Sequence, residues 1–339
     1  MKAVSISQSQ RLKLFSQQPR NKPCGIWHWT CISVSFIKHL RVIMPKMMLS
    51  VSLLSAYLYC SRKLFLEKVL LLQEPPKESL VIGGIRHEIY DKINKSEEEI
   101  VKSITKSITA EKIQDLYKQK YSAILEKSIA DNKKRLEGVS ITMNEAYKRC
   151  FPLIIEESSA RASNVFSFIE ENNVFGEELW QKLTPKILSE LRVESDALKL
   201  KGIIDQVHVY ENDYVPFELK TGSMPRDGVW PSHRIQVAAY SLLLEEKFKK
   251  KIKEGFVIYI DSKQKSRQKR QIAINPFLRE EVRQIIGEVI MLLQSKELPD
   301  FCGNENKCRK CGLKDRCYNE QEMDALLKIR LCSKLNKLH

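Results

Sequence analysis

Midway along the chain, the spacing of apolar residues changes from a helical period to a strand period. Residues 97–135 and 143–172 carry Ile and Leu at helical spacing among Lys and Glu, which predicts two long amphipathic helices. The segments 189–193, 198–209 and 214–221 instead alternate or are β-branched, with turn residues between them, as expected for strands. This order favours an α+β fold in which a helical insertion precedes a central mixed β-sheet flanked by helices.

The segments on either side supply the remaining elements. Ser50 is placed to cap an early helix, and Gly83-Gly84 precede a short helix over 85–93 that carries His87. After the three strands we expect a helix at about 232–250, short strands at 255–261 and 271–275, and a last long helix to about 296. We divide the chain into a basic N-terminal extension (1–43), an N-terminal helical part (44–96), a helical insertion (97–187), a core (188–299) and a Cys-rich C-terminal region (300–339).

The charge is strongly unbalanced, with 57 Lys and Arg against 42 Asp and Glu and a formal net charge of +15. Residues 1–50 hold eight basic residues and no acidic one. A basic surface favours nucleic acid as a partner. Residues 1–43 are either a basic arm that contacts nucleic acid or, the interpretation we favour, a mobile or misassigned start before Met44. The sequence has no run of 18 apolar residues, so we expect no membrane span and a cytoplasmic protein.

Three charged residues in the middle strands form the most informative pattern. Glu218 and Lys220 are two apart in a strand and therefore point to one face. A hairpin that turns through Glu211-Asn212 pairs residues whose numbers add up to 423, which places Asp205 opposite Glu218, with Cα atoms about 4.5–5.5 Å apart. A turn one pair further along places Asp205 opposite Lys220 and keeps all three side chains on one face.

Two carboxylates at this separation repel each other unless a cation lies between them. Oxygen ligands suit Mg²⁺ or Mn²⁺, which keep bound water that can attack a phosphoryl group, while Lys220 can orient that water. The alternative is a surface ion pair between an acid and Lys220, which contributes less than ~1 kcal/mol. The apolar neighbours Gly202-Ile203-Ile204 and Val215-Pro216-Phe217 indicate burial, where unpaired acids are costly. The burial favours the metal site.

Cysteines are concentrated near the end of the chain. Cys308, Cys311 and Cys317 place three thiols within ten residues, and one more soft ligand would complete a tetrahedral site for zinc or for a four-iron cluster. The fourth ligand is either the nearby Cys302 or the distant Cys60, and the spacing leaves both open. We interpret the remaining cysteines as ordinary thiols: Cys24, Cys31, Cys150 and Cys332.

A second basic feature lies between the two short strands. It is either a solvated loop or a set of sequence-independent contacts to DNA phosphates. The candidate residues are Lys263, Lys265, Arg267, Lys269 and Arg270.

Several short motifs occur in a specific order: Gly83-x-x-x-His87, Gly202-Ile-Ile-Asp205, Glu218-Leu-Lys220 and Gln236-x-x-x-Tyr240. With Cys60 before them and the three clustered cysteines after them, they resemble the RecB-like branch of the PD-(D/E)xK nucleases. Within that branch the pattern is similar to the CRISPR-associated exonucleases, the fourth Cas family, over roughly residues 50–320. The resemblance implies a restriction-endonuclease-like α/β core at 188–299.

The resemblance also assigns roles to individual residues. It implies that His87, Asp205, Glu218 and the backbone carbonyl of Leu219 hold Mn²⁺ or Mg²⁺, and that Lys220 is the catalytic lysine. Gln236 and Tyr240 would brace the lysine or contact DNA; helix packing is the simpler alternative for both. A [4Fe-4S] cluster would be held by Cys60, Cys308, Cys311 and Cys317.

The function implied is that of a metal-dependent DNA exonuclease, acting 5′-to-3′ on single strands. Its family processes DNA ends during the acquisition of CRISPR spacers, together with the CRISPR integrase proteins. One alternative is a RecB-like repair nuclease outside CRISPR systems. Another is a non-catalytic, cluster-bearing DNA-binding subunit, against which the intact set of Asp205, Glu218 and Lys220 argues.

Overall fold

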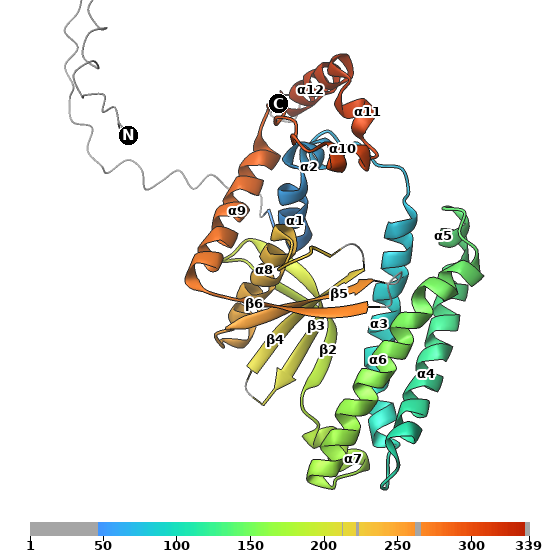
Figure 1. Ribbon diagram of the computed structural model, residues 1–339. Coiled ribbons are helices and arrows are strands. Elements are labelled where there is room, and N and C mark those ends of the chain that lie inside the picture. The colour runs from blue at the N-terminus through green and yellow to red at the C-terminus, as the bar shows by residue number, and fades with distance from the viewer. Residues whose placement is uncertain (1–46, 212, 222–223, 262–265, 336–339) are drawn as a thin grey trace, which may run out of the picture. The chain divides into compact units, whose positions relative to one another are not determined.

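The computed structural model describes residues 47–211, 213–221, 224–261 and 266–335 (Figure 1). The expectations for residues 1–43 and for Lys263 and Lys265 lie outside these ranges. In the described part of the chain, no helix combines the length and apolar character needed to cross a bilayer.

A mixed sheet forms the centre of the fold, as the sequence predicts. Within the described residues it has six strands, in the order β1-β3-β4-β5-β6 with β2 paired to β3. β1–β3 and β4–β5 pair parallel, and the other neighbours pair antiparallel. The strands are β1 (Leu49–Ser50), β2 (Lys186–Ser195), β3 (Leu200–Tyr210), β4 (Asp213–Thr221), β5 (Glu254–Asp261) and β6 (Ser266–Ala273). β6 begins five residues before the expected strand at 271–275.

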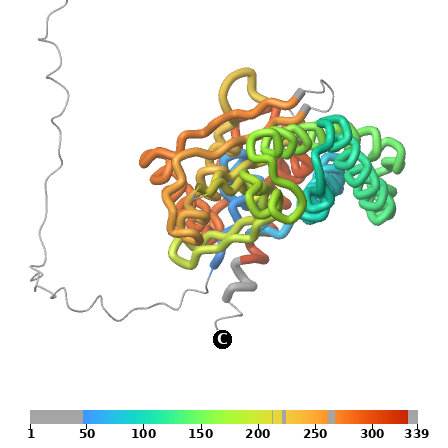
Figure 2. The backbone as a smooth tube through the Cα atoms, turned by 90° about the horizontal axis from the view of Figure 1, so that it is seen from below, coloured from blue at the N-terminus to red at the C-terminus, as the bar shows by residue number. Residues whose placement is uncertain are grey.

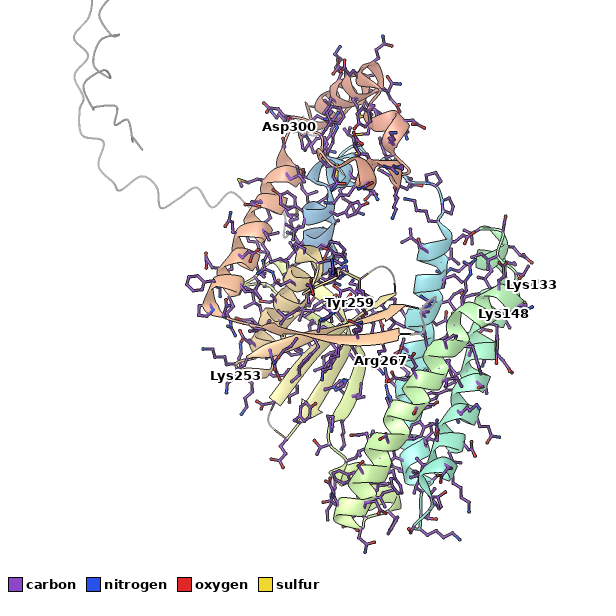
Figure 3. All side chains as sticks on the ribbon, viewed as in Figure 1. Lys133, Lys148, Lys253, Tyr259, Arg267 and Asp300 are labelled. Atoms are coloured by element: carbon purple, nitrogen blue, oxygen red, sulfur yellow. The ribbon has the colours of Figure 1, made fainter. Side chains whose placement is uncertain are left out.

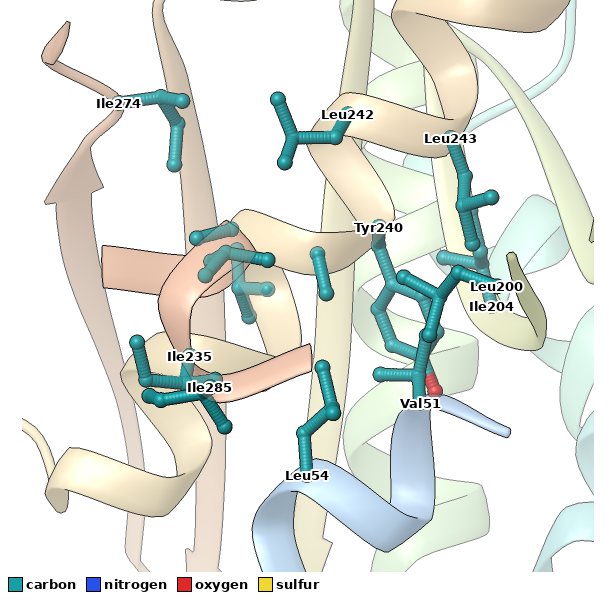
Figure 4. Close-up of a cluster of buried hydrophobic side chains, with 14 of the residues drawn as sticks. Val51, Leu54, Leu200, Ile204, Ile235, Tyr240, Leu242, Leu243, Ile274 and Ile285 are labelled. Carbon is teal, nitrogen blue, oxygen red and sulfur yellow. The ribbon is translucent and has the colours of Figure 1, made fainter. Parts of the chain in front are cut away.

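One face of the sheet is covered by helices of the core. α8 (Pro231–Phe248) packs along β2, β3, β4 and β5, with α1 (Val51–Tyr59) and α9 (Pro276–Gln294) against it. Figure 4 shows Tyr240 of α8 facing Leu200 and Ile204 of β3 within this core. A Cβ at Gly202 would lie 2.7 Å from Cε1 of Tyr240, so α8 approaches β3 this closely because position 202 is glycine.

The helix α3 and the helical insertion that continues from it pack against the other face of the sheet (Figure 2). Tyr90 of α3 and Leu153 of α6 are buried and pack in one cluster with Phe217 and Leu219 of β4. The helices are α3 (Glu78–Lys102), α4 (Ala110–Asp131), α5 (Lys133–Glu137), α6 (Met143–Asn172) and α7 (Gly176–Lys182). α6 has the predicted bounds, and Thr142 and Glu145 form a capping box at its start.

Two helix expectations in this region are wrong. The single helix expected over 97–135 is interrupted, because α3 ends at Lys102 and Thr109 caps a new helix, α4. Gly83-Gly84 do not precede a helix but lie inside α3. Gly84 leaves room for Arg135, whose guanidinium nitrogen would lie 2.9 Å from an added Cβ. Close packing of α5 on α3 therefore outweighs the low helix propensity of glycine.

A buried ionic network holds α3, α4 and α6 together. Arg161 of α6 donates to Glu97 of α3 at 2.8 Å and to Glu157 at 2.9 Å. Tyr117 and Tyr121 of α4 donate their hydroxyls to the Glu97 carboxylate. Because α3 also carries His87, this network fixes the helix that delivers the histidine to the sheet.

The C-terminal helices pack against the N-terminal part of the core. α10 (Glu305–Arg309), α11 (Lys314–Cys317) and α12 (Glu320–Leu335) follow α9, and α2 (Ser61–Lys68) lies beside them in Figure 1. Phe65 and Leu66 of α2 share a buried cluster with Leu313 and Met323. This packing brings the segment around Cys60 next to the Cys-rich tail.

Candidate metal centre

The hairpin of β3 and β4 has the predicted register. Gln206 pairs with Phe217 and Tyr210 with Asp213, so paired residue numbers add up to 423. The regular backbone pairing of the two strands ends at Gln206 and Phe217. Beyond this pair, the side chain of Asp205 accepts a hydrogen bond from the Leu219 backbone N–H at 2.7 Å. The two strands therefore open at the point where Asp205 and Glu218 face each other.

The alternation of inward- and outward-facing side chains along β3 is interrupted at Asp205. Leu200 and Ile204, before Asp205, and Val207, after it, all pack in one core. A regular strand would send Ile204 and Val207 to opposite faces. On the neighbouring strand Glu190 has a left-handed φ of 47°, an uncommon conformation for a residue with a side chain. This distortion turns Asp205 and Glu190 toward the gap between the strands.

The two predicted carboxylates are deeply buried, with 5% of Asp205 and 3% of Glu218 exposed. Oε1 of Glu218 accepts hydrogen bonds from Lys220 at 2.6 Å and from Gln236 at 2.7 Å. Oε2 of Glu218 is buried and, within the described structure, has no hydrogen-bond partner. A buried anionic oxygen without a donor is costly, and a divalent cation bound by oxygen ligands satisfies it. The residues present therefore fit Mg²⁺ or Mn²⁺.

Gln236 and Tyr240 extend this network from α8. Oε1 of Gln236 accepts from Lys220 at 2.9 Å and from Ser55 at 3.3 Å. Its Nε2 donates to the hydroxyl of Tyr240 at 3.0 Å. Their spacing of four residues places both side chains on one face of α8. Gln236 is thus in contact with both the lysine and one carboxylate of the motif, which limits the positions open to the Lys220 ammonium.

His87 reaches the opposite side of Asp205 from α3. Its Nδ1 lies 3.3 Å from Oδ1 of Asp205 and 3.2 Å from Oε1 of Glu190. One ligand atom each from His87, Glu190 and Asp205 all lie within 4.8 Å of one another, close enough to share a metal ion. Our sequence reasoning missed Glu190. The register of β2 and β3 would have found it, because Ser189 pairs with Gln206 and Leu191 with Ile204, which sets Glu190 opposite Asp205.

The electrostatics of the site favour a bound cation. Burial and then the Glu218 carboxylate hold the pKa of Asp205 well above its usual range. The hydrogen bond to Glu190, opposed by burial and reinforced by Asp205, raises the pKa of His87 to about 9. Burial would lower the pKa of Lys220, but the Glu218 carboxylate outweighs it and the pKa is raised. Positive charge is therefore stabilised throughout this gap.

Five cysteines line a single pocket between the α1–α2 junction and the C-terminal helices: Cys60, Cys302, Cys308, Cys311 and Cys317. Arg62 helps to join the two segments, since its Nε donates to Sγ of Cys317 at 3.2 Å and its Nη1 to the carbonyl of Pro299 at 2.6 Å. Sγ of Cys60 accepts the Lys63 backbone N–H at 3.3 Å. The convergence of these thiols fits a soft metal or an iron–sulfur cluster.

The basic residues expected in a loop are largely part of a strand. Arg267, Lys269 and Arg270 lie in β6, where paired strand hydrogen bonds extend the sheet to Ser266. Arg267, labelled in Figure 3, forms an ion pair with Glu157 of the insertion at 3.7 Å. Lys269 lies over the ring of Phe256 at 3.9 Å, and Arg270 donates to Gln268. The loop expectation is therefore wrong for these three residues, because contacts with the insertion and β5 stabilise them in the sheet.

Comparison with known proteins agrees with this geometry. The model of the PD-(D/E)XK nuclease superfamily matches residues 48–318, and the chain belongs to that superfamily. A CRISPR-associated exonuclease Cas4/endonuclease Cas1 fusion of Leptospira interrogans is 32% identical over 156 residues, 43% of this chain and 28% of that protein. A similar fusion of Myxococcus xanthus is 34% identical over 137 residues, 39% of this chain and 23% of that protein.

A separate CRISPR-associated exonuclease Cas4, from Francisella tularensis subsp. novicida, is 30% identical over 127 residues. That match covers 38% of this chain and 60% of the relative. The chain thus spans less than two thirds of each of these curated relatives.

Proposed function

We propose that this chain is a divalent-metal-dependent DNA exonuclease that acts 5′-to-3′ on single strands. The observation that carries the proposal is the buried pair of Asp205 and Glu218 beside Lys220, with one Glu218 oxygen that has no donor among the described residues. Superfamily membership supports phosphodiester hydrolysis as the reaction. The polarity and the preference for single strands rest on the resemblance to CRISPR-associated exonucleases.

Each residue of the site has a distinct proposed role. Asp205, Glu218, His87 and the Leu219 carbonyl would hold Mg²⁺ or Mn²⁺, which when bound supplies charge for the phosphoryl oxygens. Lys220, held by Glu218 and Gln236, would orient the attacking water and neutralise developing negative charge. Tyr240 supports this arrangement through Gln236.

Glu190 adds a role that the motifs do not include. It would either join the ligand set or accept the Nδ1–H of His87 and leave Nε2 as the ligand atom. Both arrangements add negative charge beside Asp205 and strengthen cation binding.

For the cysteine pocket we propose a [4Fe-4S] cluster held by Cys60, Cys308, Cys311 and Cys317. The support is that Cys60, 248 residues before Cys308, lines the same pocket as the three clustered cysteines. A local zinc site with Cys302 in place of Cys60 is the alternative. The cluster would join the N-terminal helices to the tail and so shape the surface that holds DNA.

We place the enzyme in the processing of DNA ends during CRISPR spacer acquisition, with an integrase as its partner. Two relatives are fusions of an exonuclease with the endonuclease Cas1, which supports this partnership. A relative of a different kind favours the alternative, a RecB-like repair nuclease outside CRISPR systems. A DNA replication ATP-dependent helicase/nuclease of Arabidopsis thaliana is 26% identical over 129 residues, 35% of this chain and 10% of that protein.

The proposal is tested with single strands labelled at either end, incubated with Mn²⁺, Mg²⁺ or chelator. We expect stepwise cleavage from the 5′ end that chelator abolishes. Asp205→Asn should lower the rate by orders of magnitude, because the metal loses a charged ligand, while DNA binding persists. Asp213→Asn, an exposed carboxylate in the same hairpin, is the matched control and should keep full activity. Full activity of Asp205→Asn in Mg²⁺ would contradict the assignment.

A further inference from the structure

The cysteine pocket contains one thiol more than a four-ligand site requires. Cys302 lines the pocket together with the four proposed ligands. Its Sγ lies 3.4 Å from Sγ of Cys308, and both residues are partly exposed. A disulfide has an S–S length of about 2.05 Å, so closure of this pair needs a movement of little more than 1 Å.

The local backbone conformation places Cys302 next to Cys308. Gly303 follows it with a left-handed φ of 61°, which reverses the chain, and Asn304 then caps α10, in which Cys308 lies. The ring of Phe301 is held between the Arg62 guanidinium, 3.9 Å from its centroid, and the ring of Tyr318, at 4.6 Å. Cys302 is therefore fixed from both sides rather than carried on a free loop.

We infer that Cys302 is a resolving thiol that forms a reversible disulfide with Cys308 when the cluster is absent. The inference goes beyond the proposed function but rests on it in one respect, the assignment of Cys308 as a cluster ligand. The disulfide withdraws that ligand, so the cluster cannot be rebuilt until the pair is reduced. It also protects Cys308 from irreversible oxidation to sulfinic acid.

The oxidant is a small disulfide such as oxidised glutathione. The thiolate of Cys308 attacks one of its sulfurs, which forms a mixed disulfide and releases one glutathione thiolate. The thiolate of Cys302 then attacks the Cys308 sulfur, forms the Cys302–Cys308 bond and releases the second glutathione. The two cysteine protons pass to the two released thiolates, and two electrons pass from the protein to glutathione.

The test uses the full chain, depleted of iron with a chelator, reduced, and then exposed to oxidised glutathione. Free thiols are alkylated, and peptides are mapped by mass spectrometry without reduction. We expect a linked Cys302–Cys308 peptide, which dithiothreitol removes. Cys302→Ser should give no linked peptide, while Cys150→Ala, which removes a buried thiol in the insertion, should behave as the unaltered chain does.

Two kinds of wrong linkage would overturn the inference: a disulfide from Cys302 to a different thiol, or a disulfide from Cys308 to Cys60, Cys311 or Cys317. It would also be overturned if Cys302 and Cys308 were alkylated at the same rate before and after oxidation. Iron reloading is measured separately. A linked peptide in a protein that never binds iron would refute the proposed cluster but not the disulfide. Iron uptake that is equal before and after formation of the disulfide would overturn its proposed effect on Cys308.

Discussion

At the residue scale, the site depends on a few contacts that compensate one another. Glu218 would be an uncompensated buried charge without Lys220 and Gln236, which both donate to Oε1. Its Oε2 has no hydrogen-bond partner in the part of the chain that the structure describes. Asp205 occupies the gap where the strands part and uses its second oxygen to satisfy the Leu219 backbone N–H. The arrangement is preorganised for a cation because the protein's own donors satisfy only some of the carboxylate oxygens.

Glu190 gives a prediction at this scale. In chelator-treated protein, Glu190→Gln should lower the pKa of His87 from about 9 toward its ordinary value of roughly 6.5, because the acceptor that stabilises the imidazolium loses its charge. An NMR pH titration of the His87 ring signals measures this change.

The matched control is Glu194→Gln, an exposed carboxylate on the same strand, which should leave the pKa of His87 unchanged. A similar pKa in both variants would mean that Glu190 does not hold the histidine. In Mg²⁺, Glu190→Gln should also reduce the cleavage rate, whereas Glu194→Gln should not.

At the scale of elements, the sequence predicts those helices, strands and strand registers that are determined by patterns within a short stretch of the chain. The register of β3 and β4 could be predicted because one short turn joins the strands and the apolar alternation fixes it. Glu190 was missed because its place depends on the β2–β3 connection, whose register the alternation does not reveal. The start of β6 was missed because residues 266–271 are all polar or charged, so no apolar alternation marks them as a strand. Pairing with β5 and the ion pair of Arg267 with Glu157 stabilise them in the sheet. The short helices α10 and α11 have no periodic pattern of apolar residues from which a helix could be predicted.

The buried network of the insertion gives a second prediction at this scale. Arg161→Ala leaves Glu97 and Glu157 buried without their shared cation, which should lower the free energy of unfolding by about 3–5 kcal/mol. Arg149, like Arg161, lies on α6, and Arg149→Ala removes an exposed ion pair with Glu78 of α3, which should cost less than ~1 kcal/mol. Denaturant unfolding of both variants measures the difference, and equal losses would show that the buried network stabilises the fold no more than an exposed ion pair does.

At the scale of the molecule, two distant segments are joined at the cysteine pocket. Arg62 donates to Cys317 and to the Pro299 carbonyl, and Glu74 accepts both the Gly312 backbone N–H at 2.7 Å and the Lys63 ammonium at 2.9 Å. The same α1 that leads to Cys60 places Ser55 on Gln236. The cysteine pocket and the metal centre are therefore both supported by α1, although their ligand atoms are of different kinds.

This connection leads to the last prediction. Anaerobically purified protein should contain about four irons per chain and absorb broadly near ~400 nm, as a [4Fe-4S] cluster requires. Cys60→Ser should lose iron and thermal stability together, because a cluster that closes so long a loop restrains the unfolded chain. Cys302→Ser should keep its iron and its melting temperature, because Cys302 is assigned no ligand role in the loaded state. One zinc per chain, retained in Cys60→Ser and lost in Cys302→Ser, would instead establish a local zinc site, and the two segments would then be held together by packing and by direct contacts such as those of Arg62 and Glu74.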